Sequence, residues 1–301
     1  MTPFHRAARQ AFTPLLTPFS ETGLDLEALA SAVDRQIIAG MDGIIVGDAI
    51  GEGQVLTGDE RDALLRACVV RARPHLSVIA ATGTNCTKTT IERSRRAEAL
   101  GADALLVTVP YYSKPTLAGV VGHFHQLAAA VGLPILIDDD PGRTAKDFGP
   151  ALLEALSDRH AIAGVCHGAD RLAYFAGLSS ALETRFQHLT RDDARLPQFL
   201  ALGGHGAISP IANVIPSPVQ TMVSLGGSFE SVGSFGAAVS GAVAALGRDD
   251  VAALKEAASF IHQCPADVRL PLVPAEPETV IRIRHAFAPF ARGETGRQMA
   301  A

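Results

Sequence analysis

Three consecutive aspartates are the residues of this sequence that most directly suggest chemistry. Asp138, Asp139 and Asp140 follow a short apolar run at 134–137 and precede Pro141. Side chains alternate along a strand, so Asp138 and Asp140 would share one face and Asp139 the other. Asp138 and Asp140 could form an acid/base pair or bind a hard cation. Alternatively, aspartates cap a following loop; capping is favoured for Asp139, and both roles stay open for Asp138.

A second apolar run ends in Cys166 and His167. His167 could join Asp138 and Asp140 as a ligand of a divalent metal ion. Cys166 would act as a nucleophile only if its pKa were lowered, whereas neighbouring carboxylates raise the pKa of a thiol. The sequence therefore favours an unreactive thiol at Cys166.

Two loops add an arginine and a pair of tyrosines. Arg143 follows the aspartates, where its guanidinium could bind a carboxylate in bidentate fashion or form a structural salt bridge. Tyr111 and Tyr112 lie between Pro110 and Pro115, and a phenol there could donate to a substrate oxygen or relay a proton. Adjacent loop aromatics more often pack at an interface, so both roles remain open.

The elements that must position these residues follow a regular pattern of short β-rich apolar runs, most of them followed by a helical stretch. The runs cover 12–16, 43–47, 77–81, 104–109, 134–137, 161–166, 185–189 and 206–209. Eight such βα units within about 210 residues predict an α/β fold, a (β/α)8 TIM barrel over 1–217 with a helical C-terminal extension over 218–301. No GxGxxG follows a strand, which disfavours an open doubly wound sheet.

Helix ends can be placed by their capping residues. Thr57 with Glu60 three residues later predicts a capping box, and Asn85 or Thr87 is expected to cap the next helix. The basic run RSRR at 93–96 in that helix is typical of a solvated helix face.

Composition restricts the class of protein. The 301 residues are 48% hydrophobic and 19% charged, which excludes disorder. A net charge of −5 disfavours binding to nucleic acid or anionic lipid and leaves small molecules as the expected partners. The four cysteines form no CxxC pair, the N-terminus lacks a secretory signal, and prolines and glycines interrupt the apolar stretch at 196–247. We therefore expect a cytoplasmic protein without a membrane segment.

Several segments, in order, resemble the dihydrodipicolinate synthase and N-acetylneuraminate lyase family of class I aldolases. They are TPLLTPF (13–19), GDAIGEGQVL with DER (47–56, 59–61), ATGTNCT (81–87), VPYYSKP (109–115), PGRT (141–144) and LGGHGAISPIAN (202–213). The last segment is more similar to the dihydrodipicolinate synthase branch. The resemblance implies a (β/α)8 barrel, a homo-oligomer (dimer or tetramer), a keto acid such as pyruvate as substrate, and no cofactor.

The strand-six motif departs from the family pattern. The resemblance implies a lysine that forms a Schiff base with the substrate, but that position holds Cys166. A thiol can add to a carbonyl but cannot form an iminium. The four lysines, Lys88, Lys114, Lys146 and Lys255, all lie outside strand six.

Other positions of the implied site also differ. The relay tyrosine aligns with Asp138, and two threonines align with Ala49 and Ile50. Tyr112 remains, at the position that in the family reaches into the neighbouring subunit's site. The ligand-binding positions implied by the resemblance are Ala49, Ile50, Arg143 (which would bind a substrate carboxylate), Arg191 (at an expected glycine) and Ile208 at the end of strand eight.

Two functional hypotheses follow. The first is a barrel that binds a small keto acid or other carboxylate but cannot form the pyruvate Schiff base. The second is a lysine-independent lyase in which Asp138, Asp140 and His167 hold a divalent cation that polarises a keto acid. An ordinary dihydrodipicolinate synthase conflicts with Cys166.

Overall fold

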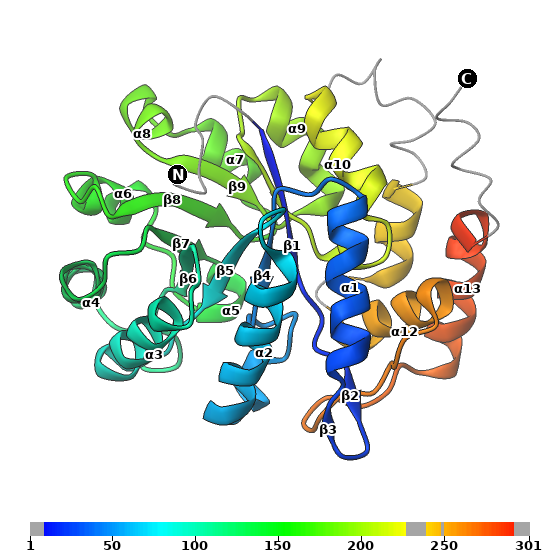
Figure 1. The fold of residues 1–301 in the computed structure, drawn as a ribbon. Coiled ribbons are helices and arrows are strands. Elements are labelled where there is room, and N and C mark those ends of the chain that lie inside the picture. Colours follow the sequence, from blue (N-terminus) through cyan, green and yellow to red (C-terminus); the bar gives the residue numbers. More distant parts are fainter. Residues whose placement is uncertain (1–8, 227–238, 248–249, 292–301) are drawn as a thin grey trace.

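The fold is built around a closed barrel of eight parallel strands, as the sequence predicts (Figure 1). The computed structural model describes residues 9–226, 239–247 and 250–291. The barrel strands are β1 (Gln10–Pro14), β4 (Gly43–Val46), β5 (Ser77–Ala81), β6 (Ala104–Thr108), β7 (Ile135–Asp139), β8 (Ile162–His167), β9 (Gln187–Thr190) and β10 (Gly206–Ile208). The barrel closes because β1 pairs with both β4 and β10.

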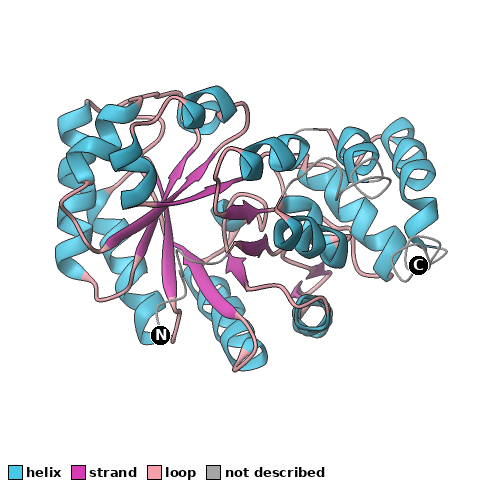
Figure 2. Cartoon of the chain, turned by 90° about the horizontal axis from the view of Figure 1, so that it is seen from above, coloured by secondary structure: helices cyan, strands magenta, loops and turns pink. Residues whose placement is uncertain are grey.

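Helices surround the strands and continue beyond them on one side (Figures 1 and 2). They are α1 (Leu26–Ile38), α2 (Gly58–Ala72), α3 (Thr87–Ala99), α4 (Leu117–Ala130), α5 (Pro141–Thr144), α6 (Pro150–Leu156), α7 (Leu172–Ala176), α8 (Ser180–Arg185), α9 (Leu196–Ala201), α10 (Pro216–Leu225), α12 (Val251–His262) and α13 (Pro277–Ala291). The described chain also contains short 3-10 turns η1 (Gly53–Val55), η2 (Asp193–Arg195) and η3 (Pro210–Asn213), and a two-stranded ribbon of β2 (Phe19–Ser20) and β3 (Gly23–Leu24). Residues 239–246 are also helical.

The alternation of strand side chains produces two apolar layers. One layer lies between the strands and the helices, and a second fills the barrel interior. The buried members of the interior layer are Phe12, Ile45, Ile79, Ala104, Leu106, Leu136, Cys166, Leu189 and Ile208. The interior is therefore packed with side chains, and chemistry is confined to the ends of the strands.

Two of the expected strands are longer than their apolar runs. Strand β7 extends through Asp139, and β8 extends through His167. Asp138 pairs in register with Cys166, and Asp139 pairs with His167. The polar residues continue the strands because their backbone groups still find partners in the neighbouring strand.

The helix-start predictions have mixed outcomes. The Thr57–Glu60 capping box is present at the start of α2. The predicted cap at Asn85 or Thr87 is wrong, because Cys86 is the N-cap residue of α3 and Thr87 is already helical. The Thr84 hydroxyl explains the difference, since it accepts a bond from the Cys86 N–H at 3.1 Å and fixes the turn before the helix.

The C-terminal helices are attached to the barrel by a buried ion pair. The Lys255 ammonium on α12 lies 2.5 Å from a Glu52 carboxylate oxygen in the loop after β4, and both side chains are almost fully buried. The expected division after residue 217 falls inside α10, which contacts β1, and the division itself stays a prediction. Among the described helices, none has the length and apolar character to span a membrane.

Candidate functional site

A buried ion bridge of three side chains, Asp48–Arg191–Asp138, lies at the carboxyl ends of the barrel strands. Arg191 Nη1 lies 2.8 Å from Asp48 Oδ2, and Arg191 Nε lies 3.1 Å from Asp138 Oδ1. Asp48 follows β4, Asp138 belongs to β7, and Arg191 follows β9 directly. The Arg191 side chain is 4% exposed. The closed barrel therefore brings together three charges from distant parts of the sequence.

The charges of the bridge depend on one another. Burial opposes the charge of Arg191, but the carboxylates of Asp138 and Asp48 keep its pKa well above the usual value. Burial raises the pKa of Asp138, and Arg191 limits that rise. Arg191 Nη2 is also buried, and it has no hydrogen-bond partner in the described part of the chain. The bridge thus leaves the Nη2 amino group of the guanidinium buried and without an acceptor among the described residues.

Cys166 lies inside the barrel, at the strand position level with Asp138. Its side chain belongs to the interior layer and is fully buried. Burial raises the pKa of the thiol well above its usual value, despite the opposing influence of Arg191. The predicted unreactive thiol agrees with this environment, because the thiolate form required for nucleophilic attack is disfavoured.

His167 points to the opposite side of β8 from Cys166. Its Nε2 lies 2.9 Å from His188 Nδ1, and the ring packs against Tyr174 and Phe175 outside the strands. The proposed metal ligands Asp138, Asp140 and His167 therefore do not converge, and that arrangement is wrong. In residues 9–226, 239–247 and 250–291 there is no group of three or more histidine, cysteine or acidic side chains suited to a metal ion.

The other two aspartates of the run do not have the roles expected from the sequence. Asp140 is the capping residue, since its carboxylate accepts a hydrogen bond of 3.0 Å from the Gly142 N–H at the start of α5. Asp139 instead faces Arg171, with 3.2 Å between Oδ2 and Nη2. Burial raises the pKa of Asp139 to about 6, although Arg171 acts in the opposite direction. The capping role predicted for Asp139 is therefore wrong.

A cavity of about 230 Å³, here called the mouth cavity, opens beside the bridge. Its lining includes Asp48, Asp138, Ala49 and Arg143. The remaining lining residues are Gly47, Gly53, Gln54, Arg61, Ala81, Gly83, Arg93, Leu106, Thr108, Tyr111 and Thr144. Two of the predicted ligand-binding positions, Ala49 and Arg143, thus face the same space.

A second cavity of about 240 Å³, here called the acidic cavity, involves the arginine of the same bridge. Arg191 and Ile50 line it, together with carboxylates near β7, β9 and α12. These carboxylates belong to Asp140, Asp192, Asp193 and Asp250. The predicted ligand-binding set is therefore divided, with Ile50 and Arg191 in one cavity and Ala49 and Arg143 in the other.

Besides Cys166 and His167, two further predicted site residues line neither of these cavities. Ile208 is fully buried in the interior layer of the barrel. Tyr112 is 89% exposed and has a positive φ of 66°. Its expected contact with a neighbouring subunit stays a prediction. Tyr111, by contrast, lines the mouth cavity.

Three polar residues of the site were not singled out from the sequence as ligand-binding residues. Asp48 follows directly on the end of a barrel strand, so its position was a usable signal. Arg61 and Arg93 line the mouth cavity from α2 and α3. The expectation that the whole run at 93–96 is a solvated face is therefore wrong for Arg93.

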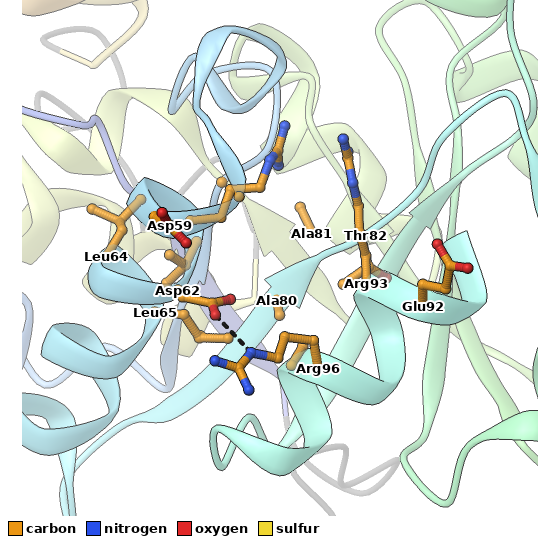
Figure 3. A pocket seen from close by; sticks show the side chains of 15 residues that line it. Asp59, Asp62, Leu64, Leu65, Ala80, Ala81, Thr82, Glu92, Arg93 and Arg96 are labelled. Atoms are coloured by element: carbon orange, nitrogen blue, oxygen red, sulfur yellow. Dashed lines mark hydrogen bonds and ion pairs between the residues drawn. The ribbon is translucent and has the colours of Figure 1, made fainter. Parts of the chain in front are cut away.

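A third cavity of about 410 Å³, here called the helix cavity, lies between α2 and α3 over the ends of β4 and β5 (Figure 3). It shares Gly47, Arg61, Ala81 and Arg93 with the mouth cavity. In Figure 3, Arg96 meets Asp62 while the Arg93 side chain extends away from that pair.

The comparisons with known proteins agree on one family. The model of the dihydrodipicolinate synthetase family matches residues 7–286. A 4-hydroxy-tetrahydrodipicolinate synthase of an Anaeromyxobacter species is 33% identical over 284 residues, which cover 92% of this chain and 95% of the relative. The enzyme of that name from Bradyrhizobium diazoefficiens is 32% identical over 282 residues, which cover 93% of this chain and 95% of the relative.

Solved structures with the same architecture include the dihydrodipicolinate synthase from Aquifex aeolicus. It has a TM-score of 0.88 and 29% identity, with 94% of this chain and 98% of that chain covered. The 4-hydroxy-tetrahydrodipicolinate synthase from Methylacidiphilum fumariolicum SolV has a TM-score of 0.90 and 26% identity, with 96% and 97% covered.

Proposed function

Because the chain belongs to the dihydrodipicolinate synthetase family, we propose that it uses the mouth of the barrel to bind a small keto acid or other carboxylate. We further propose that it does so without forming a Schiff base. The covalent chemistry that the family resemblance implies needs an amine that condenses with a ketone. In this chain, the residue at the implied position is Cys166.

The observation that carries this proposal is the position of Cys166 relative to the bridge. The thiol is fully buried inside the barrel, level with Asp138, and its pKa is raised by burial. None of the four lysines lines the mouth cavity or the acidic cavity. The Lys255 ammonium is paired with Glu52. These observations support a mouth that binds a ketone without condensing it with an amine.

Binding of a carboxylate is supported by the charges around the mouth cavity. Arg143 lines this cavity and is one-third exposed, with its Nε 3.5 Å from Asp140 Oδ2. An arginine at the edge of a cavity can donate two parallel hydrogen bonds to the carboxylate of an entering molecule. Arg61 and Arg93 line the same cavity and add to its positive charge. The carboxylate of a keto acid presents oxygens that accept hydrogen bonds from such guanidinium groups.

A metal-assisted lyase is not favoured by a specific observation. Asp138 faces Arg191 at the mouth, whereas His167 packs against His188 on the other side of the strands. The groups that would have held the cation point away from each other. The proposal is therefore that the carboxylate binds without a metal ion held by these residues.

We also propose that the chain forms a homo-oligomer, a dimer or a tetramer. Tyr112 supports this, since a large aromatic side chain that is 89% exposed on a loop is typical of a contact surface. Sedimentation velocity of the intact chain tests this part, and a monomer over the micromolar range contradicts it.

The test of the mechanism is trapping with pyruvate and borohydride. We expect no covalent adduct by intact mass spectrometry. Calorimetric titration with pyruvate, 2-oxobutyrate and acetate under the same conditions should show binding by at least one of them. A reduced adduct on any lysine would show that an imine forms and would contradict the proposed mechanism. If none of the three acids binds, the proposed ligand class is wrong.

A further inference from the structure

Two arginines at the wall between the mouth cavity and the helix cavity have no carboxylate partner. Arg61, on α2, and Arg93, on α3, line both cavities. Within the described ranges, neither forms an ion pair, and Arg93 makes no side-chain hydrogen bond. The neighbouring Arg96 differs, because its Nε lies 2.6 Å from Asp62 Oδ2. The helix pair thus neutralises one arginine and leaves the other two uncompensated.

Arg61 is held in place although its charge is not balanced. Its Nη2 donates to the Gly53 carbonyl, and its Nε is buried without a partner among the described residues. Burial, and then the positive charge of Arg93, lower the pKa of Arg61 to about 10. A cation kept half-buried beside a second cation costs stability unless an anion joins them.

The surrounding carboxylates do not remove this imbalance. Asp48 and Asp138, which line the mouth cavity, already face Arg191. In the helix cavity, Asp62 faces Arg96, and Glu92 is exposed with Lys88 at 4.0 Å. Asp59 is exposed and, in the described part of the chain, forms no ion pair with either arginine. The positive charge therefore persists at the wall shared by the two cavities.

We propose that Arg61 and Arg93 bind a second acidic group of the ligand, so that the molecule is a dianionic organic acid. One acidic group binds at Arg143, and the other reaches the wall formed by Arg61 and Arg93. All three arginines line the same mouth cavity of about 230 Å³, and this size suits a small organic acid. This inference rests on the proposed function and adds the ligand class, which is a dicarboxylate or a phosphorylated carboxylate.

A matched pair of keto acids tests the second acidic group. 2-Oxopentanoate and 2-oxoglutarate share the keto acid and the number of carbons, and they differ in a terminal methyl or carboxylate. By calorimetric titration of the full chain at fixed salt, we expect 2-oxoglutarate to bind about tenfold more tightly, because charge-assisted bonds form at the second end. Phosphoglycolate in the same titration shows whether a phosphate is preferred.

The variants identify the groups responsible. Arg93→Gln should reduce the ratio between the two keto acids to within about twofold while leaving the affinity for 2-oxopentanoate unchanged. Arg93 makes no side-chain bond in the described chain, so this variant is expected to fold normally. Arg61→Gln should act in the same direction, although it also loses the bond to the Gly53 carbonyl. Arg95→Gln is the control, because Arg95 is exposed on the same helix and lines neither cavity.

The outcomes separate this inference from the proposed function. A ratio near one in the unmodified chain, or a ratio unchanged by Arg93→Gln, overturns the second anion site. If Arg143→Gln weakens both keto acids equally while Arg93→Gln has no effect, the proposed function stands alone. If 2-oxoglutarate binds and only the variants of Arg61 and Arg93 weaken it, the arginine pair stands and the role of Arg143 fails. Failure of every acid to bind overturns both.

Discussion

The two cavities that meet the buried bridge have opposite charge. The mouth cavity contains three arginines whose charge exceeds that of its two bridge carboxylates, whereas the acidic cavity, as far as the structure describes its lining, contains four aspartates and only Arg191. Both lie at the carboxyl ends of barrel strands, and their volumes are nearly equal. The two cavities therefore differ in charge and not in their position in the fold or their volume. An organic acid is attracted to one side of the bridge and repelled by the other.

Removing the arginine of the bridge, which both cavities meet, should have the largest effect, and we expect it on the stability of the fold. Arg191→Met leaves Asp48 and Asp138 buried without a cation, and we expect the free energy of unfolding to fall by about 3–5 kcal/mol. Urea denaturation followed by circular dichroism measures this loss.

A compensated variant provides the control for the bridge. Adding Asp48→Asn and Asp138→Asn to Arg191→Met removes the uncompensated charges and should recover most of the lost stability. If Arg191→Met alone costs less than about 1 kcal/mol, the bridge is not the electrostatic centre that its burial indicates.

Acid should destabilise the fold through the histidines on the outer side of β8. This loss of stability limits the pH range over which binding to the two cavities can be compared. Burial lowers the pKa of His188 to about 4. Below pH 6.5 the unfolded chain binds a proton that the folded chain excludes. Stability is thus complete above pH 6.5 and falls by up to about 3 kcal/mol as the pH approaches 4.

Urea titrations between pH 7 and pH 4.5 measure this dependence. His188→Gln should make the dependence shallower, although His167 next to it, whose pKa burial also lowers, continues to contribute. Parallel pH dependences for the two proteins would show that the His188 imidazole is protonated equally in the folded and unfolded chains.

Neutralising one charge on each side of the bridge tests the comparison directly. Arg143→Gln should weaken the binding of a carboxylate such as pyruvate about tenfold, because it removes a charge-assisted contact in the mouth cavity. Asp192→Asn, in the acidic cavity, should change that affinity less than about twofold. Calorimetric titrations compare the two, and a larger effect of the aspartate variant would place the ligand on the other side.

Restoring an amine should have the smallest effect. Cys166→Lys places an ammonium in the fully buried interior next to Arg191. Asp138 and Ala49 also leave the implied proton relay incomplete. We expect no turnover of pyruvate and an aldehyde by this variant, as measured by product chromatography. Measurable turnover would show that a lysine at this position is enough to allow the reaction.

The barrel could be predicted from the sequence because its signal is local. Apolar runs such as those at 77–81 and 104–109 coincide with β5 and β6 to within one residue. The opposite orientation of Cys166 and His167 also follows from strand alternation. The predicted metal site is wrong because the alternation was considered only within the aspartate run. The register of β7 with β8 pairs His167 with Asp139, whereas Asp138 pairs with Cys166.

The bridge could not be predicted from the sequence in the same way. Asp48 and Arg191 are 143 residues apart, and only closure of the barrel brings them within 2.8 Å. The role of Arg93 was hidden for a similar reason. On its own helix it belongs to a basic run, and only the packing of α3 beside α2 turns it toward a cavity.

The attachment of α12 has a consequence for how the chain can be divided. Glu52 is fully buried, four residues after Asp48, and depends on Lys255 for its counter-charge. A shortened chain that ends before α12 would lack both the Lys255 ammonium and the Arg269 N–H that bind this carboxylate, and we expect the loop that carries Glu52 and Asp48 to be distorted. We therefore expect the C-terminal helices to stabilise the end of the barrel where the buried bridge lies, and a barrel produced without them to lose stability.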